Sequence, residues 1–556
     1  MNKIKKSLLL MLTIGLLAIG GCSGDKNSKE KTKDKIKETI VYTLTASPSG
    51  VFNPIISNTL SDDSVNDVVY ESLFKFDKNF NLVPAIAESY DASQDGTEVT
   101  FKLKDNLKWS DGTPLTMDDV LFTFYSLASP DYIGPKFGNI EKVLGAKEYQ
   151  KGKTATIKGI KKLDNNRIKF IFKESFAPAV KKIGAQPILP KHIWKKYPID
   201  TWKDQKDVMS NAVGAGPFKI VEFKPNKYVK LERNKNYSGS IAKTKYLILK
   251  EVNLDSVEVE LKNGSVDIAD VSNLKSIEID DLKSSGFNIY SYALNGIEYM
   301  GLNLRNPKLQ DKKVRQALFF GIDRKMILDR AADGKGTLVN VPMLPSEKYY
   351  PKDSINKYDY NPELAKKLLE EAGWTDRDGD GIIENASGEK FEISLKFANR
   401  QNYSNYVAPI VQKNLKDIGI KLNLENMDFV AVMEEVVGNH NFDAYLMINV
   451  LPVDGDPKPY WHSTASSDKK SIYGWNISSF KNERVDQLLV QGLQETKDKK
   501  REEIYKEFVG IMNDEVPWIT FYTGNTIKAY SKHLKNFGPV TFLNMLDAEN
   551  WYIEEN

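Results

Sequence analysis

The chain has 556 residues, of which 41% are hydrophobic and 28% are charged, and its formal net charge at pH 7 is +3. This length provides a large core and predicts about three domains, while the near-neutral charge gives no reason to expect nucleic acid as a partner. The four histidines include no pair at i and i+4, and neither a P-loop nor a G-x-S-x-G elbow occurs outside the N-terminal region. These absences weigh against the common zinc, nucleotide and serine hydrolases.

The N-terminus predicts an export signal that ends at a lipid-attachment site. A lysine-rich start precedes an uncharged run over residues 7–20, which is too short to span a bilayer as a stable helix. Ile19-Gly20-Gly21-Cys22 resembles the lipobox of bacterial lipoproteins, with Ile where Leu is more usual, and Cys22 is the only cysteine. We expect a signal peptide over residues 1–21 and lipidation of Cys22, which anchors an extracytoplasmic protein to the cell membrane. The alternative is that Cys22 is incidental.

Residues 22–39 carry dense mixed charge and almost no apolar side chains. Conformational entropy therefore outweighs burial, and we expect a disordered tether. A basic patch for nucleic acid is the alternative, but acidic residues interrupt the lysines and no aromatic residues lie between them.

From residue 40 onward, the sequence predicts strands and helices throughout, which indicates an α/β protein. Thr116 is expected to cap a helix whose first turn contains two aspartates. The Gly- and Pro-marked segments 214–217 and 303–307 are the best candidates for domain boundaries. Strands are expected over 40–44, 99–103, 391–397 and 420–424, and helices over 117–127, 314–331, 362–372 and 406–418.

Residues 376–384, with the sequence DRDGDGIIE, match the first half of a calcium-binding loop. Oxygen ligands stand at alternate positions, and Gly occurs where the chain must turn sharply. Position 12, where an EF-hand needs a bidentate Glu, is Ser387, and the loop joins a helix to a strand, so it is no EF-hand. A structural calcium ion and a solvated Asp/Gly turn both remain open, and no other cofactor is expected. The candidate ligands are Asp376, Asp378, Asp380, Ile382 and Glu384.

Segments spread over nearly the whole chain resemble family 5 extracellular solute-binding proteins, the oligopeptide, dipeptide and nickel receptors of ABC importers. The most diagnostic is residues 107–120, LKWSDGTPLTMDDV, and the order and spacing of the segments also match the family. The resemblance is greatest to the oligopeptide-binding members. The other segments are 82–90, 188–194, 214–220, 314–325 and 456–463.

The resemblance implies a type 2 periplasmic-binding-protein fold, in which two lobes enclose the ligand and the first carries an extra subdomain. Lobe 1 is then expected to be discontinuous, with residues 40–75, 213–300 and 520–556 forming its main part. Residues 76–212 would form its subdomain, and residues 301–519 lobe 2.

The resemblance also implies that the protein is a receptor and no enzyme. An oligopeptide would lie extended between the closing lobes and pair with protein main chain, before delivery to a permease served by cytoplasmic ATPase subunits. The receptor is expected to be a monomer and to bind no nucleic acid. Alternatives are the same fold with another solute (a nickel chelate, haem, an oligosaccharide or a signalling peptide) and an enzyme or surface interaction protein on this scaffold.

Family members line their cleft with an early loop, here residues 46–54, and with a stretch here spanning residues 448–461. An aspartate usually meets the peptide ammonium, and Asp454 is favoured over Asp456 for that role, although both could be surface-turn carboxylates. The turn departs from the family pattern, because Val453 and Asn449 stand near the positions usually held by Asp and Trp. The expected ligand-binding residues are Ser47, Ser49, Gly50, Phe52, Tyr299, Asn303, Arg400, Asn449, Asp454, Asp456, Trp461, Trp475 and Asn476.

Overall fold

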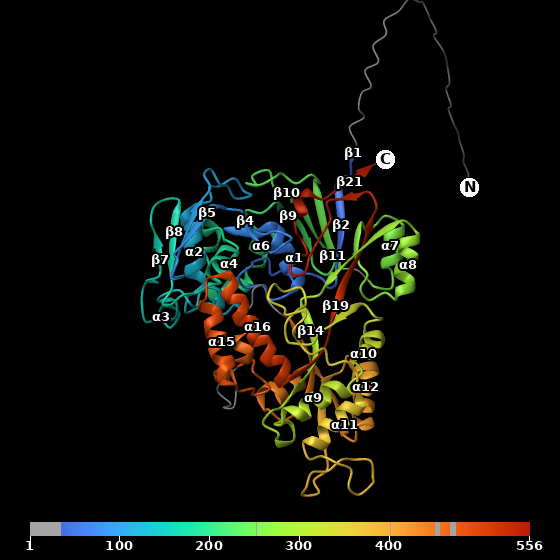
Figure 1. Ribbon diagram of the computed structural model, residues 1–556. Helices are drawn as coiled ribbons and strands as arrows, with labels where there is room; N and C mark the ends of the chain where they lie inside the picture. Colours follow the sequence, from blue (N-terminus) through green and yellow to red (C-terminus); the bar gives the residue numbers. More distant parts are fainter. Residues whose placement is uncertain (1–34, 252, 401, 451–455, 467–473, 556) are drawn as a thin grey trace, which may run out of the picture.

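The computed structural model describes residues 35–251, 253–400, 402–450, 456–466 and 474–555. It has two lobes (Figure 1). We call residues 35–293 and 525–555 lobe 1, and residues 296–522 lobe 2. The expected signal peptide, Cys22 and most of the tether lie outside the described residues, as does Asp454. None of the described helices is both long enough and apolar enough to cross a membrane.

One mixed sheet of twelve strands runs through both lobes. Its strand order is β17-β16-β18-β14-β19-β12-β2-β11-β10-β9, and β13 and β15 also pair with β19. In lobe 1 its strands are β2 (Thr39–Leu44), β9 (Phe218–Lys224), β10 (Tyr228–Arg233), β11 (Tyr246–Glu251), β12 (Ile268–Asp270) and β13 (Phe287–Ala293). In lobe 2 they are β14 (Gly296–Leu302), β15 (Gly336–Leu338), β16 (Glu392–Ala398), β17 (Lys421–Met427) and β18 (Ala444–Val450).

Strand β19 (Trp518–Ser531) belongs to both lobes (Figure 1). Its first half pairs with β14, from Trp518 to Tyr522, and its second half pairs with β13, from Asn525 to Ser531. Strands β13 and β14 are joined by residues 294–295 alone. The chain therefore crosses between the lobes at residues 294–295 and 523–524. The expected boundaries, after residues 300 and 519, lie a few residues to the lobe 2 side of these crossings.

A separate four-stranded sheet in lobe 1 falls within the expected subdomain. Its side chains and those of the large sheet share one hydrophobic cluster, which includes Tyr42 and Leu249 as well as Phe101 and Phe170. The small sheet is therefore packed into lobe 1. It consists of β5 (Ala87–Ala92), β6 (Glu98–Leu103), β7 (Ile160–Lys162) and β8 (Arg167–Ile171). The remaining strands form two small sheets. In one, β3 (Phe74–Phe76) pairs with β4 (Leu82–Pro84), and in the other, β21 (Tyr552–Glu555) pairs with both β1 (Lys35–Ile36) and β20 (Leu534–Lys535).

The two motifs that best mark the family are structural. Trp109 is fully buried, and Arg315 is buried with its guanidinium bound to Glu515 and to the carbonyls of Leu309 and Gln310. Gly214 lies so close to the Val69 carbonyl that a Cβ would stand 1.9 Å from its oxygen. That segment is therefore a tight packing contact with the main part of lobe 1, and the expected boundary at residues 214–217 stays a prediction.

The helices of lobe 1 are α1 (Leu60–Val69), α2 (Met117–Leu127), α3 (Ala146–Gln150), α4 (Ala179–Gly184), α5 (Lys191–Trp194), α6 (Lys206–Ser210), α7 (Val257–Lys262) and α8 (Ser276–Ser284). Those of lobe 2 are α9 (Lys312–Gly321), α10 (Arg324–Ala331), α11 (Pro362–Glu371), α12 (Ala408–Asp417), α13 (Phe429–Met433), α14 (Lys458–Trp461), α15 (Glu483–Gln494) and α16 (Asp498–Glu515).

The predicted elements occur within a few residues of their expected bounds, with one exception. Thr116 is the N-cap of α2 as expected, and it also forms a capping box with Asp119. The single helix expected over residues 314–331 is instead two helices, α9 and α10. Ile322 has extended backbone angles, and the Asp323 side chain accepts a hydrogen bond from the Met326 N–H, which caps α10 as a new helix.

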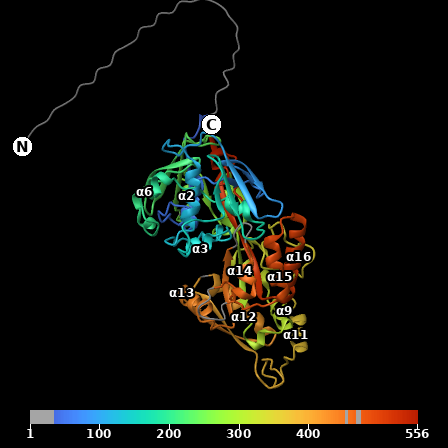
Figure 2. The same ribbon diagram turned by 90° about the vertical axis from the view of Figure 1, so that its left-hand side faces the viewer.

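The lobes also touch away from the crossings, at the end of α15. The Ala177 N–H donates to the Leu493 carbonyl at 2.8 Å, and the Ser175 hydroxyl donates to the Gln494 carbonyl at 2.6 Å. Leu493 packs into the hydrophobic cluster of lobe 1. Figures 1 and 2 both show α15 beside the lobe 1 subdomain.

Candidate functional site

The candidate site of lobe 2 lies where three parallel strands end. Strand β16 runs parallel to both β17 and β18, so the carboxyl ends of the three strands meet at one edge of the sheet. The segments that leave these ends contribute Arg400 and Tyr403 after β16, Phe429 after β17, and Tyr460 and Trp475 beyond β18. Ligands commonly bind at this edge of α/β sheets.

These segments enclose a cavity of about 260 Å³. Its lining is mostly apolar, and three of its large hydrophobic side chains remain about half exposed: Phe429 at 52%, Val450 at 51% and Trp475 at 48%. Solvent-facing apolar side chains gathered around a cavity indicate a binding surface. The cavity is lined by Tyr299, Ala398, Arg400, Tyr403, Phe429, Val432, Met433, Leu446, Met447, Ile448, Asn449, Val450, Tyr460, Trp475, Ile477 and Trp518.

Strand β18 offers an open edge to this cavity. On one side β14 pairs with all of β18, from Ala444 to Val450, whereas on the other side β16 pairs only with Ala444 and Tyr445. Within the described residues, no strand covers the β16-facing edge from Leu446 to Val450. The same five residues line the cavity, so an extended chain bound there could hydrogen bond to β18 while its side chains entered the apolar space.

Two charged residues lie at or next to the site: Arg400 lines the cavity, and Glu298 is bound to the lining residue Tyr403. The Arg400 guanidinium carbon lies 5.9 Å from the ring centroids of both Tyr403 and Phe429. The Tyr403 hydroxyl donates to the Glu298 carboxylate at 2.5 Å. Burial raises the pKa of Glu298 to about 6, although the Tyr403 hydrogen bond and the positive charge of Arg400 oppose the shift.

A second cavity, of about 370 Å³, lies in lobe 1 beside the crossing segment. It is lined by the end of β2 and by Leu294 and Asn295, and it contains the buried ion pair of Lys528 and Asp270, whose atoms are 3.1 Å apart. Each lobe therefore presents a cavity next to the two-residue connection, since Val450 in the first cavity pairs with Gly296.

Four of the expected binding residues line the lobe 2 cavity: Tyr299, Arg400, Asn449 and Trp475. Tyr299 stacks on Trp518 with ring centroids 3.8 Å apart, so it forms the floor of the cavity. Their roles in ligand binding stay predictions.

Three others, Asn303, Trp461 and Asn476, are buried in lobe 2. Asn303 donates to the Phe442 carbonyl and Asn476 donates to the Phe480 carbonyl, while Trp461 packs against Trp518. In this conformation none of the three side chains is part of the lining; Trp461 packs against the lining residue Trp518, whereas Asn303 follows the end of β14 that pairs with Ala444.

The loop over residues 46–54 is held within lobe 1. Phe52 is fully buried edge-to-face against Phe223, and the Ser49 hydroxyl and the Gly50 N–H both donate to Asp62. The Ser47 hydroxyl donates to Glu251. These bonds fix the loop in place directly after β2. The end of β2 lines the lobe 1 cavity.

Of the two candidate ammonium partners, only Asp456 lies in a described segment. Its carboxylate accepts a hydrogen bond from the Lys458 N–H at 2.8 Å, and burial raises its pKa. The assignment of the ammonium to Asp454 stays a prediction.

Several lining residues were missed by the sequence analysis, namely Tyr403, Phe429, Tyr460 and Trp518 in lobe 2 and Lys528 in lobe 1. Two of them could have been found, because Tyr403 and Phe429 follow strands that the sequence does predict. Residues that follow neighbouring parallel strands gather at one sheet edge.

Comparison with known proteins assigns the class. Residues 81–471 match the model for bacterial extracellular solute-binding proteins, family 5. The chain belongs to this family, which confirms the resemblance seen in the sequence and makes the protein an extracytoplasmic solute receptor and no enzyme.

Among individual proteins, the chain is 28% identical over 568 residues to the oligopeptide-binding protein AppA of Bacillus subtilis, and the match covers 100% of both chains. The solved structure of AppA in complex with a nonapeptide covers 94% of this chain and 100% of its own, with a TM-score of 0.73 and 27% identity. The chain is also 25% identical over 544 residues to haem-binding protein A of Haemophilus influenzae, and the match covers 93% of both chains. The two-lobed α/β fold expected from the sequence is thereby confirmed.

The raised pKa of Glu298 predicts a pH-dependent stability. The folded state holds the Glu298 proton more tightly than the unfolded state. The contribution of the protonated Glu298 to the free energy of unfolding is therefore fully present below pH 4.5 and is lost as pH rises through about 6. Glu298→Gln keeps an acceptor for Tyr403 without the buried charge. We expect it to raise the free energy of unfolding by about 1 kcal/mol at pH 7.5 and to leave it unchanged at pH 4.

Urea unfolding at the two pH values measures this difference. Glu363→Gln is the matched control, because the Glu363 side chain is 82% exposed. An equal effect of Glu298→Gln at both pH values would contradict the assignment.

Proposed function

We propose that the protein captures oligopeptides between its two lobes and delivers them to the permease of an ABC importer. The observation that carries the proposal is the open edge of β18 beside an apolar cavity. Main-chain hydrogen bonds to a strand edge are available to any peptide sequence, so they provide affinity without selecting side chains. The AppA relative, solved with a nonapeptide, supports the same cargo.

The cavity adds a preference to this general affinity. Aromatic rings dominate its exposed lining, and Arg400 supplies a positive charge at its rim. A hydrophobic peptide side chain would bury apolar surface there, at roughly 25 cal/mol per Å². We therefore infer that peptides with at least one large apolar side chain bind best.

The principal alternative is another solute in the same cavity, and haem is the one that a relative favours. The lining includes no His or Cys among the described residues, so only the Tyr or Met side chains could bind an iron axially. Peptide capture requires no such ligand, which is why it is preferred.

Native mass spectrometry of the protein expressed from Ser23 tests the cargo. We expect heterogeneous masses of short peptides as purified, their loss on refolding, and rebinding from a mixed peptide pool. Trp475→Ala should weaken peptide binding by roughly 30-fold, because truncating an aromatic anchor costs about 2 kcal/mol.

Ile277→Ala is the control, since Ile277 is 75% exposed on α8 of lobe 1. A single co-purifying haem, metal or sugar mass would overturn peptide capture. Equal affinities of the Trp475 and Ile277 variants would remove the cavity from the binding site.

We also propose that lipid on Cys22 anchors the receptor to the outer face of the cell membrane, beside its permease, and that the receptor is a monomer. The support is the lipobox-like tetrad, the uniqueness of Cys22 and the charged residues that follow it. Several acyl chains on one residue give durable attachment, whereas one chain binds only marginally.

Metabolic labelling with an alkyne fatty acid, followed by cell fractionation, checks the anchor. The wild-type chain should carry label and sediment with membranes, and Cys22→Ser should lose both properties. Label on the Cys22→Ser chain equal to that on the wild type would show that acylation occurs elsewhere.

A further inference from the structure

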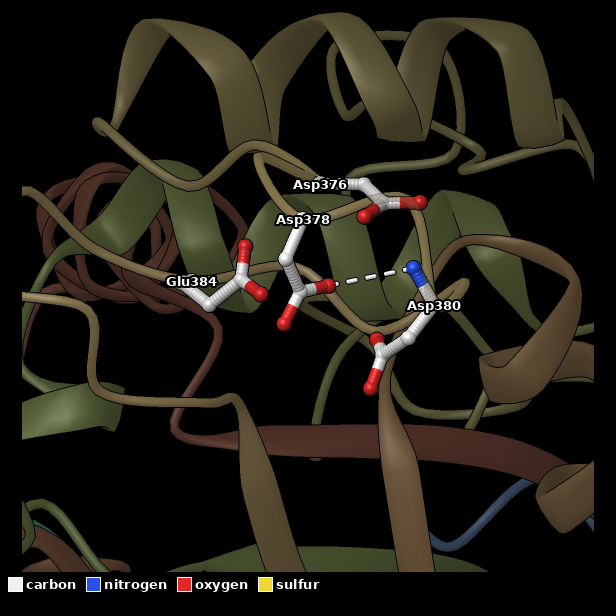
Figure 3. Close-up of side chains that lie close together, drawn as sticks. All are labelled: Asp376, Asp378, Asp380 and Glu384. Carbon is white, nitrogen blue, oxygen red and sulfur yellow. Dashed lines mark hydrogen bonds between the residues drawn. The ribbon is translucent and has the colours of Figure 1, made fainter.

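The loop between α11 and β16 gathers four carboxylates far from the peptide cavity. Asp376, Asp378, Asp380 and Glu384 each offer one carboxylate oxygen, and these oxygens all lie within 4.8 Å of one another. Figure 3 shows the carboxylates of Asp378 and Glu384 facing each other. Four like charges at this separation repel one another unless a cation lies among them.

Glu384 gives an independent indication of a ligand. Its side chain is 97% buried, and one carboxylate oxygen, Oε1, is enclosed without any hydrogen-bond donor. The other oxygen accepts from the Arg377 N–H at 2.9 Å. An enclosed carboxylate oxygen without a partner is destabilising, because it has lost its hydrogen bonds to water and no protein donor replaces them. A bound cation would supply the missing partner.

The backbone already holds the loop in a curled form. Asp376 accepts hydrogen bonds from the Gly379 N–H at 2.8 Å and the Gly381 N–H at 3.0 Å. The φ angles of Gly379 and Gly381 are 81° and 86°, values that L side chains disfavour. The loop therefore needs little rearrangement to surround an ion.

Among the described residues, Lys390 forms the ion pairs with this cluster. Its ammonium lies 3.2 Å from Asp378 and also binds Asp380. One positive charge balances only one of the four carboxylates, and the Lys390 side chain remains 35% exposed, so it can swing out into solvent. Lys390 is therefore expected to compete with a metal ion and to weaken its binding.

We propose that residues 376–384 bind a divalent cation of the calcium class, with the four carboxylates and the Ile382 carbonyl as ligands. The donors are all oxygen, and the cluster contains neither His nor Cys, which disfavours zinc and copper. Ser387 stands where a strong site has a bidentate Glu, so the affinity should match that of extracellular calcium modules, with Kd of about 10⁻⁴ to 10⁻³ M.

The site would stabilise lobe 2 and leave peptide affinity unchanged. The loop is joined to its surroundings through the Ile383 N–H, which donates to the Gly419 carbonyl at 2.8 Å, and through the pairing of Glu384 with Thr375. Residues 385–391 connect it to β16, which begins at Glu392 and whose far end, roughly 20 Å away, lines the peptide cavity.

Terbium luminescence and thermal unfolding test the site on the full chain, purified in mild detergent and stripped of divalent ions. Trp374, two residues before Asp376, can sensitise bound Tb³⁺. We expect Tb³⁺ emission that calcium displaces with half-saturation at about 10⁻⁴ to 10⁻³ M. Calcium near 100-fold its Kd should raise the unfolding midpoint by roughly 5 °C, and magnesium should require at least about tenfold more.

Variants make the test specific. Glu384→Gln and, as a second ligand change, Asp378→Asn should each weaken calcium binding at least tenfold, whereas Lys390→Gln should strengthen it. Glu363→Gln in the same lobe should leave it unchanged. The proposal is overturned if 10 mM calcium neither displaces Tb³⁺ nor moves the wild-type midpoint, if both ligand variants bind calcium like the wild type, or if calcium binds only after Lys390 is replaced.

Discussion

The two lobes are joined by paired strands, and this connection governs how the rest of the molecule can work. Strand β19 continues through both lobes, and β13 and β14 pair with its two halves. Residues 294–295 and 523–524 lie between these two pairings, and residues 523–524 pair with Thr337 and Gly336 of β15. A rotation of one lobe against the other must therefore be absorbed by a few backbone angles, while both cores stay intact.

The same connection determines where a ligand can sit. The lobe 2 cavity contains Val450, which pairs with Gly296, and the lobe 1 cavity contains Asn295. Both cavities thus adjoin the crossing, where a small rotation brings the walls together. The contact of Leu493 and Gln494 with lobe 1 gives a second place where the lobes meet, so closure is expected to involve both regions.

Much of the fold could be predicted because local rules and the family resemblance agree. Thr116 and the aspartates after it define the start of α2, and alternating residues define β6 and β16. The apolar periodicity did not predict the break between α9 and α10, because it continues from one helix into the other. The break arises where the Asp323 side chain caps α10 as a new helix. The sequence also could not show that Gly214 packs against Val69.

The site was harder to predict, because a binding surface depends on which segments meet in three dimensions. Arg400, Asn449 and Trp475 line the cavity as expected from the resemblance, yet Trp461 and Asn476, from the same region, face the interior. Trp518 carried no motif at all, although it stacks beneath Tyr299. Chemical type alone does not separate an aromatic residue that lines a cavity from one that supports it.

The central claim is that a peptide changes the angle between the two lobes, which are joined by paired strands and also meet at the end of α15. The protein expressed from Ser23 has no cysteine, because Cys22 is the only one, so spin labels can be attached at Ile277→Cys in lobe 1 and Lys413→Cys in lobe 2. Pulsed electron–electron resonance then measures the distance between the lobes with and without a peptide pool. The account predicts that the distance shifts by more than about 2 Å and that its distribution narrows when peptide binds. An unchanged distribution at saturating peptide would contradict it.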